Sequence, residues 1–229
     1  LELPKNFIFS DDETVTSTLS DVCANHGIKI SAISEPTKFP HVTSFAVGLS
    51  DKTPAHETWI KVPNSRSQSF SVEPEMAAGK IAIKVIEEMQ RGESQLIRVN
   101  FPNPDMVGHE CVPESTILAV EAVDRAMGQI FAYARDNGWS LLFGGDHGNA
   151  EMMFEVEADG VTLKQDASGM PMPHSAHTCN PVEWTLYSPH SYFSVDTSHA
   201  YGLSTLSAVA AEVLGIPADE SWDAPVFRK

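Results

Sequence analysis

Apolar runs that alternate with amphipathic helical patterns constrain the fold of this sequence more than any other feature. Residues 95–101 read as a strand that is buried on both faces. Residues 113–137 then carry the three-to-four-residue apolar spacing of a long helix, and a second buried strand follows at residues 140–143. Strands that alternate with helices in this way form parallel sheets. The sequence therefore predicts an α/β fold, with a mostly parallel sheet flanked by helices.

The rest of the chain fits the same scheme. Further strands are expected at residues 7–9, 28–33, 42–47, 58–62 and 183–187, and further helices at residues 11–25, 76–89 and 203–214. The apolar stripe of the long helix is expected to run through Ile117, Val120, Val123, Met127, Ile130 and Ala134. Residues 152–172 predict an exposed hairpin that turns at residues 158–160.

Two Asp–His pairs directly follow predicted strands. Asp105 and His109 are four residues apart, so one turn of helix can point both the same way. Asp146 and His147 follow the next strand, and ligands of α/β proteins gather where parallel strands end. Carboxylate and imidazole without thiolate suit Mn²⁺, Zn²⁺, Co²⁺ or Mg²⁺. We therefore expect a metal-dependent enzyme, with ligands enough for two ions of the kind that assist phosphoryl transfer.

Each polar cluster also has a simpler explanation. Asp105 could cap a helix, the second pair could form a polar turn, and His174 and His177 could be ordinary loop histidines. Gly108 argues against the first explanation, because a glycine inside a helix costs ~1 kcal/mol. All the clusters would have to follow strands by accident, so one shared site is the better prediction.

The charge of the chain limits its partners. Acidic residues outnumber basic ones 31 to 15, for a formal net charge of −16. Such a field repels phosphates, so neither nucleic acid nor an anionic membrane is expected as a partner. The three cysteines are widely spaced and form no C-x-x-C motif, which fits a reducing compartment, and we expect a cytoplasmic location. No apolar run approaches the ~20 residues needed to cross a bilayer.

Five ordered segments resemble one enzyme family. They lie at residues 35–43, 73–78, 103–109, 146–151 and 174–182, and read EPTKFPHVT, EPEMAA, NPDMVGH, DHGNAE and HSAHTCNPV. Together they resemble the 2,3-bisphosphoglycerate-independent phosphoglycerate mutases of the alkaline phosphatase superfamily. Order and spacing agree from about residue 28 to residue 215.

The resemblance implies a reaction and a set of site residues. The enzymes of this family interconvert 3- and 2-phosphoglycerate through a phosphoserine. Two divalent metal ions, most often Mn²⁺, assist the phosphoryl transfer. Five ligands would hold the two ions: Asp105, His109 and His177 the first, Asp146 and His147 the second. Lys38 would contact the transferring phosphoryl group, where a cation offsets negative charge.

The departures from the family pattern are equally informative. The serine nucleophile of the family, in its N-S-E-V-G-H segment, has no counterpart in these 229 residues. Neither do the aspartate that completes the second metal site and the arginine-rich region that grips phosphoglycerate. The chain therefore resembles the C-terminal portion of such an enzyme, and the remaining half is expected as a partner, in the same chain or a separate one. Residues 1–72 would end an inserted transferase-like domain, and residues 73–229 would belong to the metal-binding, phosphatase-like domain.

Two alternatives stay open from the sequence. The chain could be a non-catalytic relative that serves as a structural subunit of a larger assembly, which the missing serine favours and the retained ligands oppose. It could also be another phosphatase-like hydrolase of the same superfamily. Lys38 and the segment at residues 74–76 match the mutases specifically and oppose that second alternative.

Overall fold

The computed structural model describes residues 17–50, 52–64, 69–190, 193–196, 201–223 and 226–227. The strand expected at residues 7–9 lies outside these ranges, as do residues 11–16 of the first expected helix.

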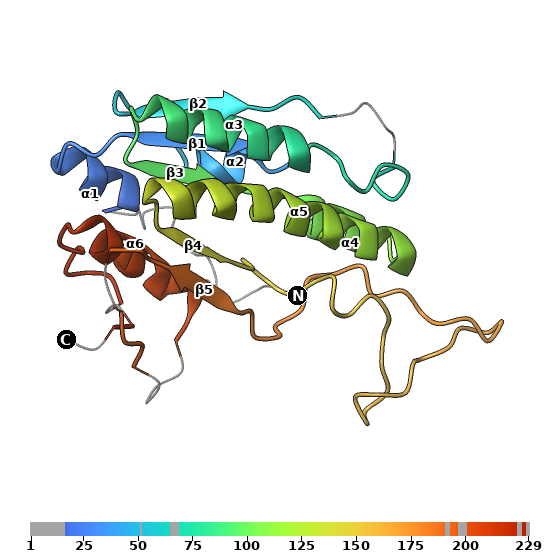
Figure 1. The fold of residues 1–229 in the computed structure, drawn as a ribbon. Helices are drawn as coiled ribbons and strands as arrows, with labels where there is room; N and C mark the ends of the chain where they lie inside the picture. The colour runs from blue at the N-terminus through green and yellow to red at the C-terminus, as the bar shows by residue number, and fades with distance from the viewer. Residues whose placement is uncertain are drawn as a thin grey trace, which may run out of the picture.

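A three-stranded parallel sheet organises the first half of the described chain (Figure 1). Its central strand, β1 (Ile30–Ser34), pairs with β2 (Glu57–Lys61) at one edge and with β3 (Leu96–Val99) at the other, and both pairings are parallel. β1, the central strand, is buried along its whole length. Each of the three strands coincides with one expected from the sequence, so the prediction of a parallel α/β fold is confirmed.

Two helices cover one face of this sheet (Figure 1). α3 (Ala78–Arg91) and α5 (Pro113–Asn137) share a core with the sheet that includes Ile33 of β1, Ile81 of α3 and Ala126 of α5. Burial of these apolar side chains supplies the main stabilisation of this half of the molecule.

The long helix α5 has the bounds that the sequence predicts, but not the predicted buried face. It begins at Pro113 and is closed by Gly138, whose φ of 73° is the left-handed conformation that favours glycine. The predicted stripe is wrong at Ile117 and Val120, whose exposed fractions are 58% and 46%. The buried residues are Thr116, Ala119, Ala122, Ala126, Ile130 and Ala134. Small side chains prevail on this face because they let two packed helices approach closely.

The helix before β1 agrees with the sequence prediction, but the segment after β1 does not. α1 (Leu19–Asn25) precedes β1 and begins with a capping box between Thr18 and Asp21. The strand expected at residues 42–47 is wrong, because the chain instead forms the short helix α2 (Phe39–Val42) followed by turns. A proline in the first turn of α2 suits a helix start and cannot donate to a sheet.

The second half of the chain adds a separate antiparallel pair. β4 (Leu141–Gly144) pairs with β5 (Trp184–Tyr187), and both strands lie close to the predicted ones. The short helix α4 (Asn103–Gly108) connects β3 to α5. The expected last helix is present as a 3-10 turn, η2 (Leu203–Thr205), that continues into α6 (Leu206–Leu214).

Residues 152–172 form an exposed arm that contains the hairpin expected at residues 158–160 and a second turn, near Gly169, that was not expected from the sequence. This arm projects from the helices and sheets (Figure 1). Val156 bridges to Leu163 in antiparallel fashion, and Gly160 turns the chain with a φ of 72°.

The proposed division of the chain at residues 72 and 73 stays a prediction. β1 and β2 lie before this boundary and β3 lies after it, yet all three belong to one sheet. Among the helices in the described ranges, none combines the length and apolar content needed to cross a bilayer.

Candidate metal centre

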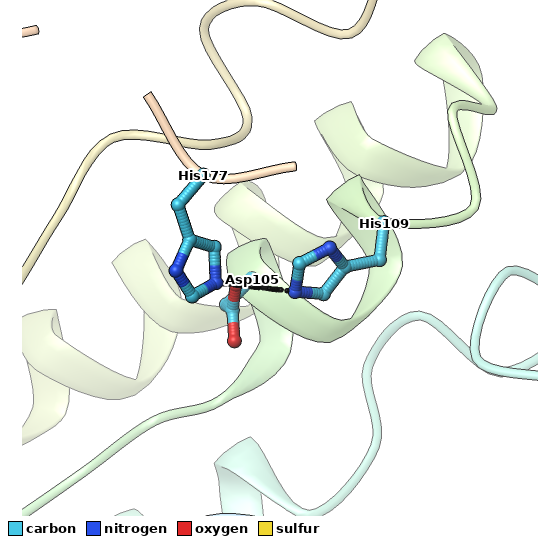
Figure 2. Close-up of side chains that lie close together, drawn as sticks. All are labelled: Asp105, His109 and His177. Atoms are coloured by element: carbon cyan, nitrogen blue, oxygen red, sulfur yellow. Dashed lines mark hydrogen bonds and ion pairs between the residues drawn. The ribbon is translucent and has the colours of Figure 1, made fainter. Parts of the chain in front are cut away.

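Asp105, His109 and His177 converge on one point (Figure 2). Asp105 lies within α4 and His109 caps it, so the two side chains leave the same side of one helical turn. The Oδ1 atom of Asp105 lies 3.0 Å from Nε2 of His109 and 3.0 Å from Nε2 of His177. The two Nε2 atoms are 3.2 Å apart. Within the part of the chain that the structure describes, these three residues form the one such group of potential metal ligands.

The backbone before His177 orients the ring of His109. Its Nδ1 atom lies 2.6 Å from the carbonyl oxygen of Ser175. A carbonyl oxygen only accepts, so Nδ1 of His109 carries the hydrogen and Nε2 presents its lone pair to the site. Two imidazole nitrogens and one carboxylate oxygen in this arrangement fit a divalent metal ion.

Asp105 is held by two further side chains. Its Oδ2 atom lies 2.6 Å from Nζ of Lys38, and its Oδ1 atom accepts a hydrogen bond of 2.6 Å from Nδ2 of Asn149. Burial acts to raise the pKa of Asp105, but the hydrogen bonds from Lys38 and Asn149 outweigh it and hold the pKa below its ordinary value. Asp105 is therefore ionised at neutral pH, as a carboxylate ligand must be.

The glycine inside α4 has a steric reason. A Cβ atom at Gly108 would lie 2.6 Å from Oδ1 of Asn149, and Asn149 is only 4% exposed. Its carboxamide therefore has little room to move. Gly108 thus keeps the space that Asn149 needs to reach Asp105.

Asp146 and His147 lie beside these three residues. The ring of His147 stacks on that of His177, with centroids 3.6 Å apart. Nε2 of His147 lies 3.6 Å from Oδ1 of Asp146 and 4.0 Å from Oδ1 of Asp105. His147 thus lies against the group formed by Asp105, His109 and His177, and Asp146 lies next to His147. His174 is not among the three converging residues, and its Nε2 atom is buried with no hydrogen-bond partner among the described residues.

Two residues that support the site were missed from the sequence. Asn149 is one, and Glu151 is the other. Glu151 accepts hydrogen bonds from the backbone N–H of Asn149 at 2.7 Å, from Nδ2 of Asn180 at 2.9 Å and from the Thr178 hydroxyl, and so ties the loop after β4 to the segment with His177. Burial acts to raise the pKa of Glu151, but these donors lower it to about 2. Both residues stand in the segment DHGNAE, which was the signal available.

A sequence model of the metalloenzyme superfamily matches residues 1–218. The chain belongs to this superfamily. Membership of this superfamily agrees with the close approach of three potential metal ligands, Asp105, His109 and His177. Together the two findings indicate divalent metal ions as cofactors.

Two curated relatives of this chain are named as phosphoglycerate mutases. The 2,3-bisphosphoglycerate-independent phosphoglycerate mutase of Rhodopseudomonas palustris is 37% identical over 170 residues, which is 74% of this chain and 31% of that protein. Mutase 1 of Methanosarcina acetivorans is 32% identical over 217 residues, which is 95% of this chain and 39% of that protein. The chain thus spans about a third of the length of these relatives.

A solved structure has the same fold. The phosphoglycerate mutase of Leishmania mexicana, crystallised at low cobalt concentration, superposes with a TM-score of 0.85 at 31% identity. The match covers 92% of this chain and 39% of the Leishmania chain.

Proposed function

We propose that this chain forms the metal centre of a 2,3-bisphosphoglycerate-independent phosphoglycerate mutase, which interconverts 3-phosphoglycerate and 2-phosphoglycerate. The observation that carries the proposal is the convergence of Asp105, His109 and His177. Relatives that share 32% to 37% of its residues are named for this reaction. The alternative of a purely structural subunit gives no reason for three ligands held in this way.

The proposed cofactors are two divalent ions, with Mn²⁺ preferred over the alternatives Mg²⁺, Co²⁺ and Zn²⁺. Asp105, His109 and His177 would hold one ion, and Asp146 and His147 would contribute to the other. Bound ions of this kind neutralise charge that develops on the attacking and leaving oxygens of a phosphoryl transfer. The protein prepares its part of the site by keeping Asp105 ionised and the lone pair of His109 turned inward.

Lys38 is the proposed contact for the transferring phosphoryl group. Its Nζ atom lies 2.6 Å from Oδ2 of Asp105, and the residue is only 7% exposed. A buried ammonium beside the metal ligands would stabilise the negative charge of a phosphate more strongly than an ammonium in water would.

The proposed reaction needs a serine nucleophile that these 229 residues do not supply in the family's N-S-E-V-G-H context. We propose that the other half of the enzyme supplies it, whether in the same chain or a separate one. We also propose that the enzyme is cytoplasmic and that it acts in glycolysis and gluconeogenesis. The three cysteines, all free, support a reducing compartment.

The test is the conversion of 3-phosphoglycerate to 2-phosphoglycerate by the protein isolated from its own cells. We expect conversion with Mn²⁺ and without 2,3-bisphosphoglycerate, and a loss of at least about a hundredfold in Asp105→Asn. Arg135→Gln, which changes a surface ion pair with Asp136, is the matched control and should retain activity. An Mn²⁺-loaded protein with no conversion, or one that requires 2,3-bisphosphoglycerate, would refute the proposal and favour the structural subunit or another hydrolase.

A further inference from the structure

The helix that follows Lys38 is too short to hold its own position. α2 has four residues, and no side chain caps its N-terminus. Isolated helices of this length are unstable in water, because nucleation costs more than so few hydrogen bonds return. The position of α2, and with it that of Lys38, therefore depends on contacts from the rest of the protein.

Arg98 on β3 supplies the contact at the end of α2. Its Nε atom donates a hydrogen bond of 2.8 Å to the carbonyl oxygen of Val42, the last residue of α2. Its Nη2 atom donates to both carboxylate oxygens of Glu57 on β2, at 3.2 and 3.0 Å. Ala32 is the neighbour of Arg98 on the central strand β1. Its small side chain leaves the guanidinium room to reach across the sheet.

Glu57 holds the guanidinium group of Arg98 in place. Its side chain is fully buried, and it accepts two further hydrogen bonds of 2.6 Å, from the Ser20 hydroxyl and from Nε1 of Trp59. A carboxylate without solvent persists only where partners of this kind satisfy it, and several partners leave it little freedom. Arg98 is therefore held in one orientation rather than swinging as surface arginines do.

The same cluster holds the start of α2. The ring of Phe39, the residue next to Lys38, meets the edge of the Trp59 ring at a centroid distance of 6.4 Å. The Lys61 ammonium lies 4.5 Å from the centre of the Phe39 ring. Both ends of α2 thus rest on residues that connect to Glu57 or belong to β2.

We propose that Glu57 and Arg98 are positioning residues that set the placement of Lys38 against Asp105. β3 carries Arg98 and leads into α4, which carries Asp105. The strand β3 therefore positions the carboxylate of Asp105 through α4, and it positions Lys38 through Arg98 and α2. The importance of Lys38 for catalysis rests on the function proposed above, whereas its placement by Arg98 does not.

The experiment measures how fast Lys38 is acetylated in the protein with Mn²⁺ present, by peptide mass spectrometry. Lys84 and Lys164, both in surface ion pairs, are references within each sample. In Arg98→Met we expect Lys38 to react about tenfold faster than in the wild type, since loss of the anchor lets α2 move, and the reference lysines to stay within about twofold. Arg125→Met, which removes a surface arginine that binds Glu75, should change none of these rates.

Arg98→Lys covers the case in which Arg98→Met does not fold. A lysine keeps Glu57 paired, but its single ammonium lacks the fork that reaches Val42 and Glu57 together. We expect folded protein, shown by an unchanged circular dichroism spectrum, and a rise of about threefold in the acetylation of Lys38 alone.

Two outcomes would overturn the inference. One is an unchanged Lys38 rate in the folded variants, and the other is an equal rise at all lysines, which would indicate general loosening. A selective rise at Lys38 supports the placement by Arg98. If that rise left conversion of 3-phosphoglycerate unaffected, the inference would stand and the role proposed for Lys38 would fail.

Discussion

Nδ1 of His109 lies 2.6 Å from the carbonyl oxygen of Ser175, two residues before His177. The contact joins two of the candidate ligands through the backbone and fixes which nitrogen of His109 faces the site. Orientation of a ligand by such a partner commonly changes metal affinity by about 10- to 100-fold.

The first prediction concerns this tautomer. In metal-free protein at about pH 8, we expect ¹⁵N chemical shifts that show His109 protonated at Nδ1 and unprotonated at Nε2. The reason is that the Ser175 carbonyl can only accept a hydrogen bond. A spectrum with the hydrogen on Nε2 would contradict the contact between His109 and Ser175.

The second prediction concerns metal stoichiometry. Calorimetric titration with Mn²⁺ should show one tight site, formed by Asp105, His109 and His177, and one weak site at Asp146 and His147. The second is weaker because fewer protein ligands leave more positions to water. His177→Ala should reduce the tight affinity by more than about 100-fold, whereas His190→Ala, at an exposed histidine bonded to the Gly138 carbonyl, should not.

The same titration has an expected pH dependence. Imidazole ligates a metal only in its neutral form, so tight binding should weaken below about pH 6. Two equally tight sites, or an affinity independent of pH between about 5 and 8, would mean that the ligands are assigned wrongly.

The third prediction concerns Gly108. Alanine inside a helix is usually more stable than glycine by about 1 kcal/mol, and Gly128→Ala in α5 should show that gain, because nothing lies within 4 Å of the new Cβ. Gly108→Ala should instead lower the free energy of unfolding and weaken Mn²⁺ binding by about tenfold, since the new methyl displaces Asn149 from Asp105. Chemical denaturation and calorimetry would measure both variants. Equal changes in unfolding free energy and in Mn²⁺ affinity for the two alanine variants would contradict the steric role of Gly108.

The fourth prediction concerns the pH dependence of stability at Glu110. This carboxylate accepts hydrogen bonds from the Ser69 hydroxyl at 2.8 Å and from the backbone N–H groups of Phe70 and Ser71 at 2.8 and 2.9 Å. Burial acts to raise its pKa, but these donors lower the pKa from 4.5 to about 2. A lowered pKa means that the stabilisation is present above pH 4.5 and is lost as the pH falls toward 2.

Glu110→Gln should therefore cost about 0.5–1.5 kcal/mol of unfolding free energy at neutral pH, since solvent screens this partly exposed carboxylate. The difference from the wild type should shrink as the pH falls below 4.5. Urea denaturation in chelator across this range would measure it. A difference that grows toward low pH would reverse the assigned sign.

The fifth prediction concerns residues 1–229 on their own. With Mn²⁺ they should not convert 3-phosphoglycerate, because the proposed transfer requires a serine nucleophile and loss of one costs several orders of magnitude in rate. An enolase-coupled assay would check this. Turnover in the usual enzyme range of ~1–10³ s⁻¹ would show that the nucleophile is present after all.

Much of the local structure could be read from the sequence. Pro113 and Gly138 mark the two ends of α5, because a fixed φ suits a helix start and a positive φ suits its end. Continuous apolar runs located β3 and β4. These features depend on backbone conformations and on hydrogen bonds between near neighbours, so a short stretch of sequence contains the information.

The tertiary structure decided the rest. Residues 42–47 have the composition of a strand, but α2 ends at Val42 and turns follow it. Arg98 and Trp59, both distant in sequence, contact the two ends of α2. Ile117 and Val120 continue an apolar periodicity, yet the alanine side of α5 is buried because α3 requires a close approach. The ion pair of Lys38 with Asp105 and the bond from His109 to Ser175 likewise join residues more than sixty positions apart. Local periodicity sets which conformation a segment prefers, but only long-range packing sets which partner it meets.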